Sequence, residues 1–289
     1  MASTQQLKSR IRSVKSTKQI TKAMQMVAAS KMRRAQEATK SSQAYTMAAR
    51  ELLTYLAAQG ATNGHKWFTV RPVKSRLLIV IASDKGLAGA YNANILKAYV
   101  RELKADGAAN IANKTIAVGR KIAQAATRIK DTEIVGTYED LPDHFSGAEF
   151  HAILNTAKDL FEAGQVDAVD VIFTRFVSSL TQRADVVRLF PAGFTPTDDV
   201  QPDIAEAKFE PSPKQIIDDI AYRLISARLF QALMDSRASE HSMRMLAMKN
   251  ATDNATDLVD ALTLEMNKAR QAAITQELTE ISAGVEAMR

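Results

Sequence analysis

The chain contains no cysteine, and only 7 prolines and 11 glycines are found among its 289 residues. Without cysteine there can be no disulfide bonds, thiolate metal sites or thiol-based switches. Long hydrophobic runs are also missing, since no apolar stretch approaches the roughly 20 residues that a membrane-spanning helix needs. The start, Met1–Gln6, lacks the apolar core of a signal peptide, so we expect a cytoplasmic protein, or at least one that is made and kept on the cytoplasmic side.

The few glycines and prolines are distributed unevenly. Neither residue occurs between Ala2 and Gln59, and neither occurs between Lys214 and Ala283. As an unbroken helix, the second stretch would be roughly 105 Å long at about 1.5 Å per residue. A domain of this size is much narrower than that. The sequence therefore predicts two long helices, one near each end of the chain, with a compact insert between them.

The first helix, predicted over Gln5–Ala58, has an irregular heptad pattern. Its apolar residues follow a 3.5-residue spacing that is interrupted at Lys18, Thr21 and Gln25, where Ile20, Met24 and Val27 are expected to take over the apolar stripe. This spacing favours a coiled coil over the alternative, an amphipathic helix of an all-helical bundle. The spaced residues are Leu7, Ile11, Val14, Ala28, Met32 and Ala35.

Positive charge is concentrated in the first helix. The chain has a net charge of +6, and ten Lys or Arg residues lie between Lys8 and Lys40 against one acid, Glu37. Such a face is expected to meet nucleic acid, anionic lipid or an acidic protein surface. Because no aromatic residue in this stretch could stack on bases, an acidic protein is the favoured partner and nucleic acid the alternative.

Between the long helices, short apolar runs alternate with helical patterns, which predicts an α/β domain with a mostly parallel sheet. Five of the seven prolines then lie between Pro191 and Pro213, which predicts an irregular connection to the second long helix. The expected strands are Arg76–Ala82, Thr115–Val118, Ile134–Tyr138, Ala168–Arg175 and Ala184–Phe190. The expected helices are Asn92–Lys104, closed by Asp106 and Gly107, then Arg120–Ile129 and 147–163.

The sequence contains no convincing active site. The loop Ser83–Gly89 lies between a strand and a helix, where phosphate groups can bind, but it matches neither a dinucleotide fingerprint nor a Walker loop. The four histidines show no metal-ligand spacing, and the pairs Asp218–Asp219 and Asp257–Asp260 are interpreted as solvated helix charges. We therefore predict a protein without catalytic residues, cofactor or metal.

Four stretches resemble the gamma subunit of F-type ATP synthase. They are LKSRIRSVKSTKQITKAMQMVAASKMRRAQ from Leu7, SDKGLAGAYNANI from Ser83, MLAMKNATDN from Met245 and NKARQAAITQELTE from Asn267. The match covers both ends of the chain and the first strand and loop of the insert. The family's terminal pattern is also present, although Val285 stands where a smaller residue is usual.

The resemblance implies a rotor of the bacterial type that couples ion-driven rotation of a membrane ring to ATP synthesis or hydrolysis. Its implied partners are the alpha and beta subunits of the catalytic head, the epsilon subunit and the ring of c subunits. Contacts with beta would be made by Met24, Lys31, Arg33, Lys85, Arg270, Gln271 and Thr275. Contacts at the foot, with epsilon and the c ring, would be made by Phe209, Glu210 and Pro211.

The predicted fold class is α/β with long helices: an antiparallel coiled coil of the N- and C-terminal helices plus a Rossmann-like α/β insert domain. Residues 1–73 would form the first long helix and a linker, 74–209 the α/β domain, and 210–289 the second long helix. The implied location is the cytoplasmic side of the cell membrane, as a peripheral subunit held through the c ring.

Overall fold

The computed structural model describes residues 4–58, 60–130, 132–142, 148–193, 212–288. The chain falls into two compact units. One unit comprises residues 29–243, and the other comprises residues 1–28 together with 244–289. Two helices belong to both units: α1 (Thr4–Ala58) and α6 (Pro213–Ala287). The domain boundaries predicted from the sequence, after residues 73 and 209, stay a prediction.

The larger unit is built on a five-stranded sheet with the order β3-β2-β1-β4-β5. Strands β3, β2, β1 and β4 are parallel to one another, and β5 runs antiparallel to β4. This confirms the mostly parallel sheet predicted from the alternation of strands and helices. The strands are β1 (Ser75–Ile81), β2 (Ala112–Val118), β3 (Glu133–Tyr138), β4 (Ala168–Phe176) and β5 (Gln182–Phe190).

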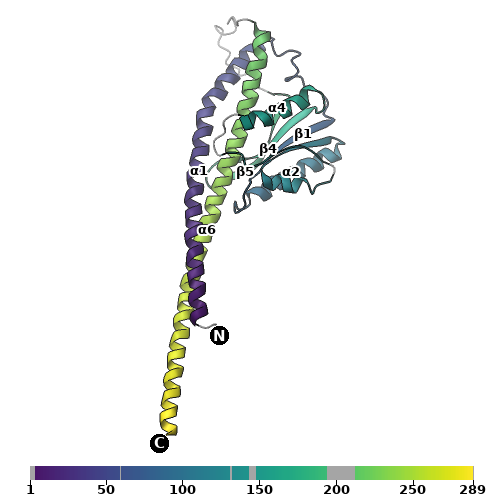
Figure 1. The fold of residues 1–289 in the computed structure, drawn as a ribbon. Helices are drawn as coiled ribbons and strands as arrows, with labels where there is room; N and C mark the ends of the chain where they lie inside the picture. The colour runs from purple at the N-terminus through teal and green to yellow at the C-terminus, as the bar shows by residue number, and fades with distance from the viewer. Residues whose placement is uncertain (1–3, 59, 131, 143–147, 194–211, 289) are drawn as a thin grey trace. The chain divides into compact units, whose positions relative to one another are not determined.

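Helices cover both faces of the sheet (Figure 1). On one face, α2 (Tyr91–Ala108) and α3 (Arg120–Ala126) enclose a core that includes Leu78, Val80 and Ile172. On the other, α4 (Ala148–Glu162) and α6 pack over Leu77, Ile79 and Val171. Because alternate residues of one strand point to opposite faces, the apolar run of β1 supplies both cores.

Helix α2 extends four residues beyond its predicted end at Lys104, so Asp106 and Gly107 lie inside the helix. The helix ends instead in a Schellman-type turn, in which Ile111 N donates to Asp106 O and Asn110 has the left-handed backbone angle φ of 55°. Asp106 is not a capping residue, because Arg76 occupies its side chain.

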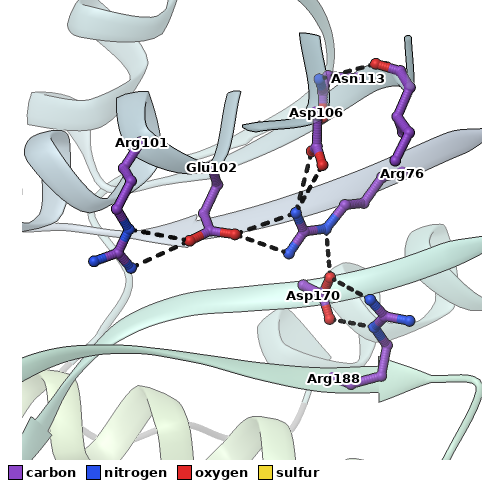
Figure 2. A network of polar contacts seen from close by, with 8 residues as sticks. Arg76, Arg101, Glu102, Asp106, Asn113, Asp170 and Arg188 are labelled. Atoms are coloured by element: carbon purple, nitrogen blue, oxygen red, sulfur yellow. Dashed lines mark hydrogen bonds and ion pairs between the residues drawn. The ribbon is translucent and has the colours of Figure 1, made fainter. Parts of the chain in front are cut away.

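A network of ion pairs links the sheet to α2 within the larger unit. Figure 2 shows the Arg76 guanidinium between Asp170 of β4 and the two acids of α2, Glu102 and Asp106. The second cation, Arg188 of β5, also binds the Asp170 carboxylate. The side chain of Asp170 is 3% exposed and that of Arg76 is 11% exposed, so this network is largely shielded from water.

Helices α1 and α6 run antiparallel, which confirms the predicted coiled coil of the terminal helices. In the larger unit, the late α1 residues Leu53 and Leu56 pack with Ile217, Ile220 and Leu224 from the beginning of α6. In the smaller unit, Leu7 and Ile11 near the start of α1 pack with Leu262, far along α6. The end of α1 therefore packs on the beginning of α6, and the beginning of α1 packs on a later part of α6, as expected for antiparallel helices.

The seam of the smaller unit also contains a buried polar layer. The hydroxyl groups of Thr21 and Thr252 are 2.8 Å apart and hydrogen-bonded to each other. Each hydroxyl oxygen also lies within hydrogen-bonding distance of a carbonyl oxygen of its own helix, 2.8 Å from Met248 for Thr252 and 3.0 Å from Lys18 for Thr21. Because each hydroxyl has one proton, one threonine donates to the other, and the accepting threonine donates to the carbonyl of its own helix. A buried polar pair of this kind fixes which residues of two helices lie opposite each other.

The predicted shift of the apolar stripe to Ile20, Met24 and Val27 was wrong. Thr21 and Ala28 stay in the seam, whereas Ile20 is 57% exposed and Val27 is 55% exposed. The reason is chemical: threonine is compatible with the seam because Thr252 satisfies its hydroxyl group. Ile20 and Val27 therefore lie outside the seam and remain exposed for contact with another surface.

Candidate partner-binding surfaces

No element that the structure describes covers the last part of α6. Every residue from Gln271 to Gly284 is exposed, including three large apolar side chains at helical spacing. Ile274 is 50% exposed, Leu278 61% and Ile281 64%. Residues at positions i, i+4 and i+7 share one face of a helix, so these three form an apolar stripe. Contiguous exposed apolar surface of this kind marks an interaction site.

Three of the predicted beta contacts lie at the start of this exposed segment. Arg270, Gln271 and Thr275 are all exposed, and Thr275 Oγ1 donates to the Gln271 carbonyl at 3.0 Å. The Gln271 and Thr275 side chains lie one helical turn apart. The Arg270 guanidinium and the Gln271 amide are therefore available to a partner next to the stripe of Ile274, Leu278 and Ile281.

The fourth predicted contact of the smaller unit, Met24, is half-buried on α1 next to the exposed Ile20 and Val27. This apolar group is bordered by basic residues of the same helix, and Lys15 and Lys22 are exposed. A surface that combines apolar contact with positive charge suits an acidic amphipathic segment of another protein.

The remaining predicted beta contacts, Lys31, Arg33 and Lys85, belong to the larger unit. Lys31 is half-buried and lines a hollow of about 50 Å³ together with Arg34, Arg237 and His241. Arg33 is exposed on the same helix. Basic side chains therefore surround this hollow from both α1 and α6, a feature that the charge count of α1 alone could not reveal.

Lys85 lies in the loop Ser83–Gly89, which does not have the character of a phosphate site. The Ser83 hydroxyl donates to the Lys85 carbonyl at 2.7 Å, and the Ser83 amide donates to Asn92 Oδ1 at 3.1 Å. The Asp84 carboxylate accepts the backbone amides of Arg120 and Asp140. Both donors of Ser83 are therefore already used, and the Asp84 carboxylate would repel phosphate. The Lys85 side chain is exposed.

The predicted foot contacts, Phe209, Glu210 and Pro211, lie outside the described residues. In the described part of the chain, no group of three His, Cys, Asp or Glu residues is placed to hold a metal ion. No described helix combines the length and the hydropathy that a membrane-spanning segment needs.

Sequence reasoning missed the acid Asp235 of α6. Burial raises its pKa to about 6, and the nearby Arg175 opposes that rise only in part. Arg175 is itself paired with Asp185 of β5 at 2.8 Å. No local signal marks Asp235 in the sequence, because its burial depends on how α6 packs against the sheet.

Replacing Asp235 by Asn is expected to stabilise the chain at neutral pH by about 3 kcal/mol, since the pKa is raised by about two units and one unit corresponds to about 1.4 kcal/mol. The folded pKa of Asp235 lies above its unfolded value of about 3.9. The buried, protonated Asp235 therefore costs no stability below the unfolded pKa of about 3.9. The free energy of unfolding falls as the pH rises from there through the folded pKa of about 6, because the folded chain resists ionisation of this carboxyl. Asparagine cannot ionise, so the advantage should vanish toward pH 4.

Urea denaturation of both proteins between pH 4 and pH 8 measures this difference. The exposed Asp257→Asn serves as the control, and its effect should be small at every pH. A gain for Asp235→Asn that is the same at pH 4 and pH 8 would show that ionisation of Asp235 is not its cause.

Three kinds of comparison place the chain among known proteins. A family model described as ATP synthase matches residues 3–288. The "ATP synthase gamma chain" of Desulforamulus reducens is 38% identical over 289 residues, covering all of both chains. That of Staphylococcus carnosus is 36% identical over 288 residues, again with complete coverage of both.

Solved structures agree with the sequence relatives. A chain of the Tetrahymena thermophila mitochondrial ATP synthase, from a structure of its central stalk and c ring, has a TM-score of 0.58 and 25% identity. The match covers 80% of the present chain and 99% of the other. A Euglena gracilis mitochondrial ATP synthase chain shares the fold with a TM-score of 0.69 and 19% identity, covering 99% and 94%. The chain therefore belongs to the ATP synthase gamma chain family.

Proposed function

We propose that this chain is the central-stalk rotor subunit of an F-type ATP synthase. The observation that carries the proposal is the uncovered end of α6, where Ile274, Leu278 and Ile281 form an exposed apolar stripe. A helix end with such a stripe requires another protein around it. Membership of the gamma chain family supports the catalytic head as that protein, with the alpha and beta subunits surrounding the helix.

A rotor needs a shaft that transmits torque and does not bind too tightly at one angle. Two helices packed along a seam resist bending better than one, and the antiparallel packing of α1 on α6 meets this need. A hydrogen bond to a charged group contributes about 1.5–3 kcal/mol, so several at one orientation would stall rotation. Most residues from Gln271 to Gly284 have apolar or small side chains, and the only charged residues among them are Glu277 and Glu280.

The proposed partners follow the same logic. Met24, Lys31, Arg33 and Lys85 would meet the acidic lever of beta, and Arg270, Gln271 and Thr275 would meet beta loops deeper in the head. Phe209, Glu210 and Pro211 would meet the epsilon subunit and the c ring at the foot. The chain would then be peripheral to the cell membrane, on its cytoplasmic side, and would be held there through the c ring.

We infer that the chain has no catalytic activity of its own. The purified chain should hydrolyse ATP at no more than background rate, while a head reconstituted with the chain should hydrolyse ATP readily. The measurement is phosphate release from each preparation under the same conditions. Comparable rates from the isolated chain and the assembled head would refute the coupling role.

Met24→Lys should lower the number of ions pumped per ATP. A new ammonium beside an acidic lever adds a charge-assisted hydrogen bond of about 1.5–3 kcal/mol, which would slow escape from that angle by roughly ten-fold or more. ATP-driven proton or sodium uptake, divided by ATP hydrolysed in the same vesicles, measures the coupling.

Met26→Lys is a matched control for Met24→Lys. It adds the same charge two residues away on α1, at a side chain that is 59% exposed. Because residues two apart do not share a helix face, Met26→Lys should pump nearly as the parent does. Unchanged pumping per ATP in Met24→Lys would remove the proposed contact with the lever.

The alternative, a coiled-coil protein that binds nucleic acid, is favoured by no specific observation. The relatives and structures described above are ATP synthase components, and the basic residues of α1 also fit an acidic protein partner. A strongly salt-dependent affinity of the isolated chain for DNA would revive this alternative.

A further inference from the structure

The linker between α1 and β1 contains the only asparagine in the chain that is followed by glycine, Asn63. Asn63 and Gly64 occupy the two central positions of a turn in which His65 N donates to the Thr62 carbonyl at 3.2 Å. Gly64 has the backbone angle φ of 73°, and a positive φ at the third position is typical of a type II turn. The pair is therefore presented by an ordered turn of the larger unit.

An asparagine before glycine is chemically reactive because the glycine nitrogen can attack the side-chain amide carbon of the asparagine. Glycine has no side chain to obstruct the attack, and its backbone reaches conformations that other residues rarely adopt. Whether the attack occurs in a folded protein depends on the freedom of two groups, the glycine nitrogen and the asparagine side chain.

Both groups are free in this turn. Asn63 and Gly64 are exposed. Among the residues that the structure describes, none accepts a hydrogen bond from the Gly64 nitrogen, and none bonds to the Asn63 side chain. A Cβ added at Gly64 would meet nothing within 4 Å, so the surroundings of this residue are open. The attack would therefore break no hydrogen bond of either group.

A second reactive pair, Asp106 and Gly107, has the opposite environment. Aspartate before glycine closes the same ring by losing water, and this pair also occurs once in the chain. The Asp106 side chain is only 6% exposed and is held by Arg76 at 3.0 Å. Gly107 lies inside α2, where backbone nitrogens donate along the helix. The fold therefore protects Asp106 and leaves Asn63 unprotected.

Asn110 provides a further comparison, because its neighbour protects it in two ways. The Ile111 nitrogen donates to the Asp106 carbonyl at 2.8 Å, so it is already engaged. The Ile111 side chain is branched at Cβ and obstructs the approach that glycine permits. We therefore expect Asn110 to stay intact under conditions in which Asn63 reacts.

We propose that Asn63 is a site of spontaneous deamidation. The Gly64 nitrogen loses its proton to base and forms a bond to Asn63 Cγ, while the Cγ–Nδ2 bond breaks and ammonia leaves. The product is a five-membered succinimide ring. Water then opens the ring at either of its two carbonyls and leaves an aspartyl residue, linked through its α- or its β-carboxyl group. The reaction needs water and base, and no group is oxidised or reduced.

The modification changes both charge and backbone at this turn. A neutral amide becomes a carboxylate two positions before His65, whose Nε2 lies 2.6 Å from Asp218 of α6. The β-linked product also adds a methylene group to the backbone of the turn. The proposal rests on the larger unit alone and does not depend on the rotor function.

Incubation of the full chain in mildly alkaline water enriched in heavy oxygen tests the proposal. Ring opening places one heavy oxygen at the reacting residue, and peptide mass spectrometry locates it. The chain is incubated both folded and unfolded in guanidinium chloride. Because an unprotected turn reacts at almost no free-energy cost, Asn63 in the folded chain should react within about ten-fold of its unfolded rate. Asp106 should react at least about a hundred-fold more slowly folded than unfolded.

Two variants complete the experiment. Asn63→Gln should take up no label at this position, because glutamine would have to close a larger ring. Asn110→Gln is the matched control and should leave the rate at Asn63 unchanged. Thermal melting before incubation checks that both variants are folded. The proposal is overturned if Asn63 stays intact in the folded chain but reacts in the unfolded one, or if Asn110 reacts faster than Asn63 in the folded chain.

Discussion

Arg76→Met should destabilise the α/β domain by about 3–5 kcal/mol, the usual cost of removing one partner from a buried ionic network. Methionine fills a similar volume but leaves Glu102 and Asp106 without their shared cation. Asp170 would keep Arg188 as its only basic partner in the network. Burial already raises the pKa of Asp106 while Arg76 opposes the rise, so the loss of Arg76 should raise that pKa further.

The pH dependence follows from the sign of that shift. Because the folded pKa of Asp106 in the variant would lie above its unfolded value, the destabilisation should be largest at neutral pH. It should shrink as the pH falls and Asp106 becomes protonated. Denaturant titrations followed by fluorescence give the measurement, since the single tryptophan, Trp67, lies in the core on the α4 face of the sheet.

Arg101→Met is the matched control for Arg76→Met. Arg101 pairs with Glu102 in the same network, but its side chain is 69% exposed. Exposed ion pairs contribute about 0–1 kcal/mol, so this variant should unfold almost as the parent does. Equal losses for Arg76→Met and Arg101→Met would mean that burial does not govern the strength of the network.

Gly119→Ala should be as damaging as Arg76→Met, by a different mechanism. Gly119 joins β2 to α3 with φ of 100°, and an added Cβ would lie 2.2 Å from the Ala82 carbonyl oxygen. The clash is with backbone of the adjacent loop, which cannot move freely because Ala82 N donates to Val118 O. Strain of about 1–3 kcal/mol and overpacking of about 1–3 kcal/mol together predict a loss of roughly 3–5 kcal/mol.

Gly107→Ala provides the contrast. Gly107 lies inside α2, has no positive φ, and an added Cβ would meet nothing within 4 Å. Alanine favours the helix by about 0.5–1 kcal/mol over glycine, so this variant should be as stable as the parent or slightly more stable. The same fluorescence titration compares the two variants. A parent-like Gly119→Ala would show that the β2–α3 turn can relax.

The long helices and the alternating insert could be predicted from the sequence because each depends on local pattern. The absence of glycine and proline over 2–59 and 214–283 marks α1 and α6 directly, and the apolar run in Arg76–Ala82 marks β1. The antiparallel pairing of α1 and α6 followed from the resemblance to a family and is confirmed by packing in each unit.

The errors arose where a distant residue decides the local outcome. Thr21 reads as an interruption of the apolar stripe, but Thr252, 231 positions later, makes it a seam residue. Asp106 reads as the end of a helix, but Arg76 of β1 occupies its side chain. Asp170, an acid in the middle of the apolar run of β4, was the one local signal that could have indicated the network in Figure 2.

The candidate site was predictable only in part. Its basic face on α1 follows from composition, whereas the apolar stripe at Ile274, Leu278 and Ile281 is recognisable only once α1 is seen to leave it uncovered. The contact of His151 on α4 with Tyr222 on α6 was not predictable, because the two residues lie 71 positions apart in the sequence.

Direct observation of rotation tests the central claim. Because the chain has no cysteine, Lys104→Cys on the exposed surface of α2 gives a single attachment point for a visible probe. In an immobilised head that contains this variant, ATP should drive the probe in one direction, with pauses at three equally spaced angles. Sustained ATP hydrolysis with a stationary probe, in complexes shown to contain the labelled chain, would contradict the assignment of this chain as the rotor.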